Sequence, residues 1–444
     1  MPTFNLKPIL LWSVLIIFSL LSSASCKNDD DDGGMPIAPA CDSTFTPIVF
    51  VHGFLASGDT YAAQFQRFES NDYCSGRLFA FDWNTLGTQD AAVQQLNLFI
   101  DNVLAATGSA KVNLVGHSAG GGLGYNYLSD ASRAAKVALY AHLGSGAQPG
   151  SAGPNGSVPT LNVWSDGDKV VQGNNIPGAT NLQLPNLDHY QVATSAATFE
   201  ALYKFFNADQ LPATTDIKPD EEVVLAGRVV TLGENAPQSG ASITIYALDP
   251  ATGNRKTTTP DAALTADANG NWGPWPAQKN TYYEFFVRTT TSGDRPIHYY
   301  REPFTRNNQL IYLRTFPPPT SLAGLLLAGV PKDDDQSVVA VFIANQAAIA
   351  QRDQLSVNAF ELATAQYASA ERTAIAFFLY DNGDGQTSGN THAAFNFLQA
   401  FLTGVDYFIP TTPQTSVQLK FNERSMAVPN LRSETDGVIV AVFD

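Results

Sequence analysis

The sequence predicts an α/β domain with a doubly wound, mostly parallel sheet, followed by an all-β region of sandwich or barrel type. Between residues 47 and 206, short apolar runs with the length of strands alternate with segments of helical spacing. Beyond residue 222 the hydrophobic period changes to two, and turn clusters separate the apolar runs. With 444 residues, 44% of them hydrophobic, the chain is long enough for two or three cores.

The N-terminal pattern contains six expected strands and four expected helices. The strands cover residues 47–52, 78–83, 112–115, 137–143, 160–164 and 181–184, and the helices cover 61–68, 90–107, a segment after residue 119, and 196–206. This alternation is the rhythm of a mostly parallel sheet. The strands expected in the all-β region cover residues 223–230, 241–248, 282–288, 311–316, 338–343, 374–379, 417–421 and 438–443.

A Gly-x-Ser-x-Gly pentapeptide, from Gly116 to Gly120, joins the third expected strand to the helical segment after it. In such a turn the Ser118 backbone is strained, so both glycines must lack bulk where strand and helix nearly touch. The strain would push Ser118 Oγ out beside the N–H groups of a helix N-terminus. Ser118 is therefore a candidate nucleophile, although a glycine-rich turn with a solvated serine has the same pattern.

An acid and a histidine follow Ser118 in the order Ser, Asp, His, each after a later expected strand. The strand at 160–164 leads to Asp166 and Asp168, and Asp166 also fits a turn, since Asp-Gly is a strong turn signal. The strand at 181–184 leads to His189, which is the expected general base. The remaining histidines are expected to be structural: His52, His117, His142, His298 and His392.

Together these motifs resemble those of bacterial lipases and esterases of the α/β-hydrolase family, in the compact form without a large lid. The resemblance covers residues 47–207 and rests on Val51-His52-Gly53-Phe54, the elbow around Ser118, Asp168-Lys169-Val170-Val171 and Asp188-His189. The linker and the segment 295–304 further resemble lipases that carry a lipid-handling β-domain behind the hydrolase.

The resemblance implies a carboxylic ester hydrolase, acting on triacylglycerols or other acyl esters through an acyl-enzyme. Its triad would be Ser118, Asp168 and His189, because Asp168 matches the family's acid-x-[Val/Ile]-Val spacing. The backbone N–H groups of Phe54 and Ala119 would form the oxyanion hole. No metal or organic cofactor is expected. The alternatives are a glycan- or lipid-binding surface lipoprotein with an inactive hydrolase domain, or a polyester depolymerase or acyltransferase with the same triad.

The expected domain boundaries follow from changes in composition. A catalytic domain is expected at residues 44–210, a linker at 211–221, a β-sandwich domain at 222–330 and a second β-rich unit at 331–444. The glycine- and proline-rich segment 144–159 has no helical apolar period, so no amphipathic lid helix is expected there. The catalytic domain should therefore be open to water unless the β-region folds over it.

Residues 1–25 resemble a bacterial lipoprotein signal peptide. A lysine precedes an apolar run too short for a comfortable transmembrane helix, and small residues then lead to Cys26, which would carry the lipid. Ser23 replaces the usual leucine, so cleavage by an ordinary signal peptidase is the alternative. Residues 26–43 contain an acidic run and are expected to be a tether to the outer surface, or else a plain acidic linker. An outer-membrane or cell-surface location is expected, with secretion as the alternative.

The net charge limits the classes of molecule that the protein can bind electrostatically, and the cysteine content indicates a disulfide. The net charge of −16 argues against nucleic acid or an anionic membrane surface as an electrostatic partner. Beyond Cys26 only Cys41 and Cys74 remain, each just before one of two strands expected to be parallel neighbours. A disulfide between them is expected, and a metal role is not. The expected partners are an ester or lipid substrate and a membrane reached through Cys26, while the oligomeric state is not predicted.

Overall fold

The computed structural model describes residues 42–396 and 400–444, which belong to one compact unit. The expected signal peptide, Cys26, Cys41 and nearly all of the acidic tether lie outside the described residues, so they stay predictions. Within the described part of the chain, no helix has the length and apolarity needed to cross a membrane. The same residues contain no cluster of three or more metal-ligating side chains suited to hold an ion.

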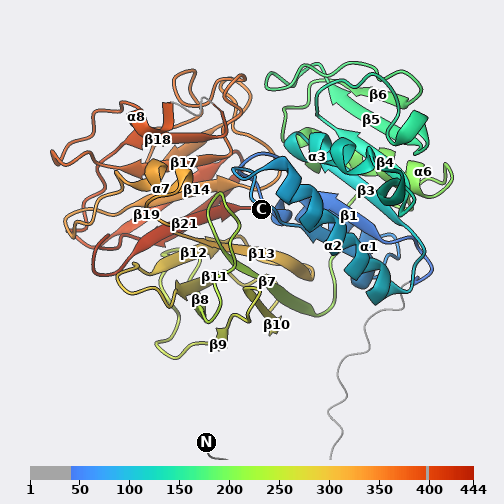
Figure 1. Ribbon diagram of the computed structural model, residues 1–444. Helices are drawn as coiled ribbons and strands as arrows, with labels where there is room; N and C mark the ends of the chain where they lie inside the picture. Colours follow the sequence, from blue (N-terminus) through green and yellow to red (C-terminus); the bar gives the residue numbers. More distant parts are fainter. Residues whose placement is uncertain (1–41, 397–399) are drawn as a thin grey trace, which may run out of the picture. The chain divides into compact units, whose positions relative to one another are not determined.

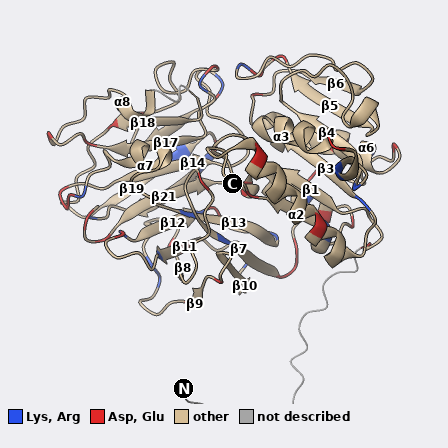
Figure 2. Ribbon diagram, in the orientation of Figure 1, with Lys and Arg blue, Asp and Glu red and all other residues tan. Residues whose placement is uncertain are grey.

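The first part of the chain forms the predicted parallel sheet (Figure 1). Its strand order is β2-β1-β3-β4-β5-β6, and every neighbouring pair is parallel. The strands are β1 (Ile48–Val51), β2 (Leu78–Phe81), β3 (Val112–His117), β4 (Val137–Leu143), β5 (Thr160–Ser165) and β6 (Thr180–Leu184). None of them carries an acidic or basic residue other than histidine (Figure 2). The order reverses between β1 and β3, and ligands of open α/β sheets bind at such a switch point.

Helices cover both faces of this sheet. On one face, α1 (Ala62–Glu69) and α6 (Ala196–Phe206) pack on residues such as Phe50 and Val115. On the other face, α2 (Gln89–Thr107) and α3 (Ala119–Leu128) pack on residues such as Val49 and Leu114. The alternation along each strand therefore divides the core into two layers. The shorter helical segments are Gly58–Tyr61, Ser75–Arg77, α4 (Ala131–Ala134), Pro154–Gly156 and α5 (Gln191–Thr194).

Three sheets make up the all-β region. The largest has eight strands in the order β18-β17-β14-β21-β12-β11-β8-β9, and the others are β10-β7-β13 and β16-β15-β19-β20. The first eight strands are β7 (Val223–Thr231), β8 (Ser242–Ala247), β9 (Ala262–Thr265), β10 (Asn271–Ala277), β11 (Tyr283–Arg288), β12 (Ile297–Arg301), β13 (Asn308–Thr315) and β14 (Val339–Ile343). The others are β15 (Leu355–Val357), β16 (Phe360–Glu361), β17 (Ala376–Tyr380), β18 (Leu402–Asp406), β19 (Ser416–Phe421), β20 (Arg424–Pro429) and β21 (Val438–Phe443). Two short helices accompany them, α7 (Leu322–Leu327) and α8 (Ala393–Asn396).

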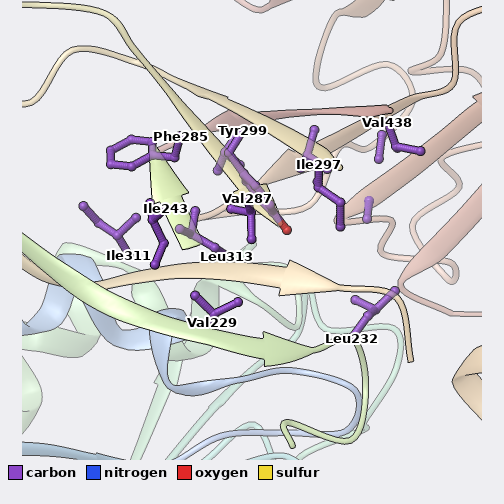
Figure 3. Close-up of a cluster of buried hydrophobic side chains, with 14 of the residues drawn as sticks. Val229, Leu232, Ile243, Phe285, Val287, Ile297, Tyr299, Ile311, Leu313 and Val438 are labelled. Carbon is purple, nitrogen blue, oxygen red and sulfur yellow. The ribbon is translucent and has the colours of Figure 1, made fainter. Parts of the chain in front are cut away.

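The two faces of the eight-stranded sheet pack on different partners. One face meets β7 and β13, where Val229 and Leu313 pack against residues such as Ile243 and Phe285 (Figure 3). The other face, which includes Val341, packs on β15, β19 and β20. The eight-stranded sheet takes strands from both sides of residue 331, so a shared sheet joins the two segments that the composition separates. The boundary at residue 331 stays a prediction.

The β-region also packs on the parallel-sheet domain. Leu310 and Tyr312 of β13 belong to the same buried cluster as Phe65 of α1. Cys74, just before β2, is disulfide-bonded, and its expected partner Cys41 lies outside the described residues. β1 and β2 are parallel neighbours as predicted.

Candidate active site

The turn between β3 and α3 has the strained geometry predicted for the Gly-x-Ser-x-Gly motif. Ser118 has φ 54° and ψ −122°, which is rare for a residue with a side chain. A Cβ atom on Gly116 would lie 2.5 Å from the carbonyl oxygen of Gly120. One on Gly120 would lie 2.3 Å from the carbonyl oxygen of Val51. Both glycines are therefore required by close backbone approach, as the sequence predicts.

Neighbouring groups hold the Ser118 backbone in this conformation. The Ser118 N–H donates to the carbonyl oxygen of Leu143 at 3.0 Å. The Ser145 hydroxyl donates to the Ser118 carbonyl oxygen at 2.8 Å. Ser145 follows β4, where some lipases place their acid, and here it braces the turn instead. A Cβ atom on Gly121 would lie 2.6 Å from Ser145 Oγ, so that glycine makes room for the brace.

Of the two candidate acids, only Asp168 contacts His189. Asp168 Oδ2 lies 2.7 Å from His189 Nδ1, and both side chains are 1% exposed. Asp168 Oδ1 accepts the N–H groups of Val170 and Val171, each at 2.9 Å. The acid-x-Val-Val spacing thus has a physical reason, because the two valines hold the carboxylate through their backbones. Asp166 is exposed and accepts a hydrogen bond from the backbone of a neighbouring loop, in keeping with a turn role.

The second nitrogen of His189 has no protein partner. His189 Nε2 is buried and makes no hydrogen bond within the described part of the chain. The ring lies between His117, with centroids 4.7 Å apart, and Phe401, at 5.7 Å. His117 Nε2 also donates to the His189 carbonyl oxygen at 2.9 Å. Burial holds the pKa of His117 well below its ordinary value, so His117 is a neutral support for His189.

The loop after β1 lies against Ser118. A Cβ atom on Gly53 would be only 3.0 Å from Ser118 Cβ, so Phe54, the next residue, is held close to the serine. Among residues 42–396 and 400–444, no protein group accepts a hydrogen bond from the N–H of Phe54 or Ala119. Two free donors beside a strained serine are the requirement for an oxyanion hole.

His52 has the structural role predicted for it. Its Nδ1 donates to the carbonyl oxygen of Gly53 at 2.9 Å, and its Nε2 accepts the Trp83 N–H at 3.3 Å. Burial lowers the pKa of His52, so the ring stays neutral in this role. His52 thereby orients the peptide before Phe54.

Family models of known proteins match parts of this chain. Residues 45–131 match the family model of class 2 lipases, and residues 221–318 match that of the lipase C-terminal domain. The chain therefore combines a lipase-type domain with a C-terminal β-domain of the kind found in lipases. A further model, described as a C-terminal domain, matches residues 340–444.

Solved structures similar to this lipase cover part of the chain. The mature lipase of Bacillus licheniformis is 17% identical over 38% of this chain and 95% of its own, with a TM-score of 0.32. The naproxen esterase of Bacillus subtilis is 17% identical over 38% of this chain and 86% of its own, with a TM-score of 0.30. Lipase B of Aspergillus fumigatus is 14% identical over 40% of this chain and 57% of its own, with a TM-score of 0.32. Similarity at this level says nothing about the substrate of the present lipase.

Three residues of the β-region reach the site, and no sequence motif pointed to them. Phe401 contacts the His189 ring, Arg352 pairs with the residue before His189, and Asn235 bonds the loop after β1. Sequence distances of more than 150 residues separate them from their partners. The β-region thus partly covers the site. The sequence predicts a catalytic domain open to water unless the β-region folds over it, and the β-region does so in part.

Arg352 and Asp188 form a largely buried ion pair beside His189. Arg352 Nη1 lies 2.8 Å from Asp188 Oδ2, and the Asp188 side chain is 1% exposed. The other carboxylate oxygen accepts the N–H groups of Tyr190 and Gln191 at 2.9 and 2.8 Å. Burial raises the pKa of Asp188, and the charge of Arg352 opposes that rise. The pair ties the His189 loop to the β-region.

A cavity lies between the catalytic domain and the β-region, and its mostly apolar lining also includes Asp59, Arg301 and Arg314. About 750 Å³ of space lies within it when the part open to solvent is included. Three lining residues directly follow residues of the site, namely Leu55 after Phe54, Tyr190 after His189 and Leu402 after Phe401. The β-region supplies further apolar walls from Leu232, Leu326, Phe342 and Val442.

Proposed function

We propose that this lipase cleaves carboxylic esters with Ser118 as nucleophile, His189 as general base and Asp168 as the acid that orients His189. The observation that carries the proposal is the arrangement around His189. Asp168 binds Nδ1 at 2.7 Å, which leaves Nε2 as the nitrogen that can accept a proton, and Nε2 is buried with no partner in the described residues. A buried nitrogen without a partner is costly unless substrate or nucleophile uses it.

The reaction divides into two steps. Ser118 Oγ attacks the ester carbonyl while His189 Nε2 takes the hydroxyl proton and passes it to the leaving alcohol. Water then attacks the acyl-enzyme, with His189 again as base. The negative charge of Asp168 balances the imidazolium in each step, and its bond to Nδ1 fixes the productive tautomer. No hydrogen bond joins Ser118 Oγ to His189 in the described chain, and such bonds often form only with substrate present.

The backbone N–H groups of Phe54 and Ala119 are the proposed oxyanion donors. Their freedom from protein acceptors and the nearness of Gly53 to Ser118 support this role. A donor of this kind contributes about 10²–10³-fold to kcat in a well-studied serine hydrolase. The donors are backbone groups, so side-chain substitution at Phe54 tests its position rather than its chemistry.

The proposed substrate is an ester with an apolar acyl chain. Support comes from the cavity-lining residues Leu55, Tyr190 and Leu402, since each of them is adjacent in sequence to a residue of the site. Burial of each methylene of the chain there is worth about 0.8 kcal/mol. The preference for longer chains would therefore depend on the β-region as well as on the catalytic domain.

We further propose that the enzyme acts outside the cytoplasm as a lipoprotein anchored through Cys26. Support comes from the sequence alone, in the apolar run, the small residues before the cysteine and the acidic segment after it. Metabolic labelling with radioactive palmitate should mark the wild-type chain and leave Cys26→Ser unlabelled. A labelled Cys26→Ser chain would exclude this anchor.

Replacement of the nucleophile tests the proposed function. Ser118→Ala should abolish hydrolysis of p-nitrophenyl esters and labelling by a fluorophosphonate probe, while circular dichroism shows an intact fold. Ser157→Ala is the matched control, because Ser157 is exposed in the segment after β4 and should keep full activity. Undiminished turnover or labelling in folded Ser118→Ala would refute the assignment.

A further inference from the structure

A second pocket lies on the eight-stranded sheet, on the face that packs against β15, β19 and β20. It is lined by side chains of β11 and β12 and by loop residues near 254 and 435, and it encloses about 820 Å³ including the part open to solvent. Glu284 of β11 is the cross-strand partner of Tyr300 on β12, and Phe286 is the partner of His298. Paired residues point to the same face, so this row of polar and aromatic side chains lines one wall. No lining residue comes from residues 44–210.

Glu284 is the buried centre of this wall. Its side chain is 2% exposed and accepts two hydrogen bonds from Arg255, at 2.6 and 2.7 Å. It also bonds His298 Nδ1 at 2.6 Å, while His298 Nε2 lies 2.8 Å from the carbonyl oxygen of Asp436. A carboxylate and a carbonyl only accept, so each nitrogen of His298 faces an acceptor. The Glu284 carboxylate is therefore fully engaged by Arg255 and His298.

Three donors around Glu284 remain without an acceptor in the described residues. The Tyr300 hydroxyl makes no hydrogen bond although the residue is only 2% exposed. Burial and the charge of Glu284 raise the pKa of Tyr300 well above its ordinary value, so the hydroxyl keeps its proton. Arg255 Nη1 is unpaired, and the Arg288 guanidinium contacts only the ring of Phe286, with 4.9 Å between Cζ and the centroid.

Aromatic rings hold the arginines in place. The Arg255 guanidinium lies over Tyr246, with its Cζ 3.7 Å from the ring centroid. Phe286 lies beside both Arg255 and Arg288. The other carboxylate of the pocket, Asp436, is already paired with Arg432 at 2.9 Å. The pocket therefore presents free donors and positive charge, and its two acidic side chains are occupied.

We propose that this pocket is a binding site for an oxyanion, a carboxylate, phosphate or sulfate group held between Arg255, Arg288 and the Tyr300 hydroxyl. Such a group supplies the acceptors that these donors lack, and charge-assisted hydrogen bonds to guanidinium are among the strongest in proteins. The net charge of −16 repels anions at long range, so any anion bound here is held by these local donors. The site is separate from Ser118 and goes beyond ester hydrolysis.

Isothermal titration of the full chain with inorganic phosphate and with acetate tests the site. Saturable phosphate binding is expected, and Tyr300→Phe and Arg288→Ala should each weaken it by about tenfold. Lys256→Ala is the matched control, since Lys256 is exposed next to Arg255 but does not line the pocket. It should change the affinity by no more than about twofold. Hydrolysis of p-nitrophenyl butyrate should be unchanged in all three variants, so this test is independent of the catalytic proposal.

Vesicles distinguish the sources of the anion. Binding to phosphatidylglycerol vesicles but not phosphatidylcholine vesicles, lost in Arg288→Ala, would identify a lipid phosphate. Binding of free phosphate or acetate without vesicle binding would identify a soluble anion. The proposal is overturned if neither phosphate, acetate nor phosphatidylglycerol binds, or if Tyr300→Phe and Arg288→Ala bind phosphate as the wild type does.

Discussion

The side-chain amide of Asn235, in the turn after β7, donates a 2.8 Å hydrogen bond to the carbonyl oxygen of Ala56, in the loop that carries the proposed oxyanion donor. The same amide bonds the Trp83 carbonyl oxygen at 3.1 Å, and its oxygen accepts the Ser57 hydroxyl at 2.6 Å. Asn235 is only 6% exposed. A residue of the β-region therefore fixes the position of the loop beside Ser118.

Removal of this amide should slow catalysis. We expect Asn235→Ala to lower kcat by about 10–100-fold with KM little changed, because a small displacement of the oxyanion loop affects the transition state most. Asn235→Asp keeps the shape but loses the N–H donors and should be equally slow. Asn280→Ala is the control. Asn280 has a φ of 59°, close to the 56° of Asn235, but its side chain is exposed. Steady-state kinetics on p-nitrophenyl butyrate measure kcat and KM of each variant. A kcat of Asn235→Ala within twofold of wild type would contradict the role of Asn235 in positioning the oxyanion loop.

Exchange of each candidate acid separates Asp168 from Asp166. Asp168→Asn should reduce kcat by about 10⁴-fold, the loss known for the well-studied serine triad, because His189 is left in the wrong tautomer. Asp166→Asn should leave kcat within about threefold, since Asp166 bonds only a loop backbone. Both variants are assayed on the same ester after a check of folding by circular dichroism. The reverse pattern would move the role to Asp166.

Much of the candidate site was predictable because its signals are local. The elbow glycines are needed for backbone approach at Gly116 and Gly120, and Asp168 is held by the two valines that follow it, so each feature left a short motif. Asn235 and Arg352 left none. Their contacts join segments far apart in the sequence, and an isolated Asn or Arg in a loop has many ordinary explanations.

Loss of Arg352 should destabilise the loop of His189. Arg352→Met leaves the buried Asp188 carboxylate without its cation, and we expect the free energy of unfolding to fall by about 2 kcal/mol. Removal of one partner from a fully buried ion pair costs about 3–5 kcal/mol. The loss expected here is smaller because the Arg352 side chain is 32% exposed. Urea unfolding measures the change. Arg432→Met removes an exposed pair with Asp436 and should cost less than about 1 kcal/mol.

The effect of Arg352→Met should also depend on pH. Burial raises the pKa of Asp188 in the folded state, and loss of the opposing Arg352 charge raises it further. A raised folded-state pKa means that the folded chain binds more protons than the unfolded chain, so stability falls as pH rises through that window. The deficit of the variant should thus be larger at pH 8 than at pH 5, and Asp188→Asn in the same chain should remove the difference. A deficit that grows toward acid would contradict this account.

His142 should weaken the fold in acid. Burial lowers its pKa from 6.5 to about 4, so between these values the unfolded state binds more protons and the free energy of unfolding falls as pH drops. One such group contributes about 1.4 kcal/mol per pH unit. Urea unfolding between pH 8 and pH 5 gives the free energy of unfolding as a function of pH. Below pH 6 this free energy should fall less steeply in His142→Gln than in the wild type, by about 1.4 kcal/mol per pH unit. Above pH 7.5 the difference between the two proteins should be constant, and equal slopes at acidic pH would refute the assignment.

The fold was predictable where hydrophobic period and turns agree. The strand Val137–Leu143 and the helix Ala196–Phe206 have the predicted bounds. The prediction lacked strands such as β9 and β10, because β9 is short and β10 contains Gly and Pro residues that argue against a strand. The joining of strands from both sides of residue 331 was also not foreseen, because pairing across such distances leaves no local pattern.

The position of β21 sets the order in which the eight-stranded sheet can assemble. β21 pairs with β12 on one side and β14 on the other, yet it follows both in the sequence. The two halves of the sheet can form early as separate groups, β12-β11-β8-β9 antiparallel and β18-β17-β14 mixed, each with one unpaired inner edge that invites pairing with another chain. Insertion of β21 closes both edges at once and is a late, long-range event during synthesis. A nascent chain held before that point is therefore the form of this protein most exposed to aggregation, and the form for which a chaperone would matter most.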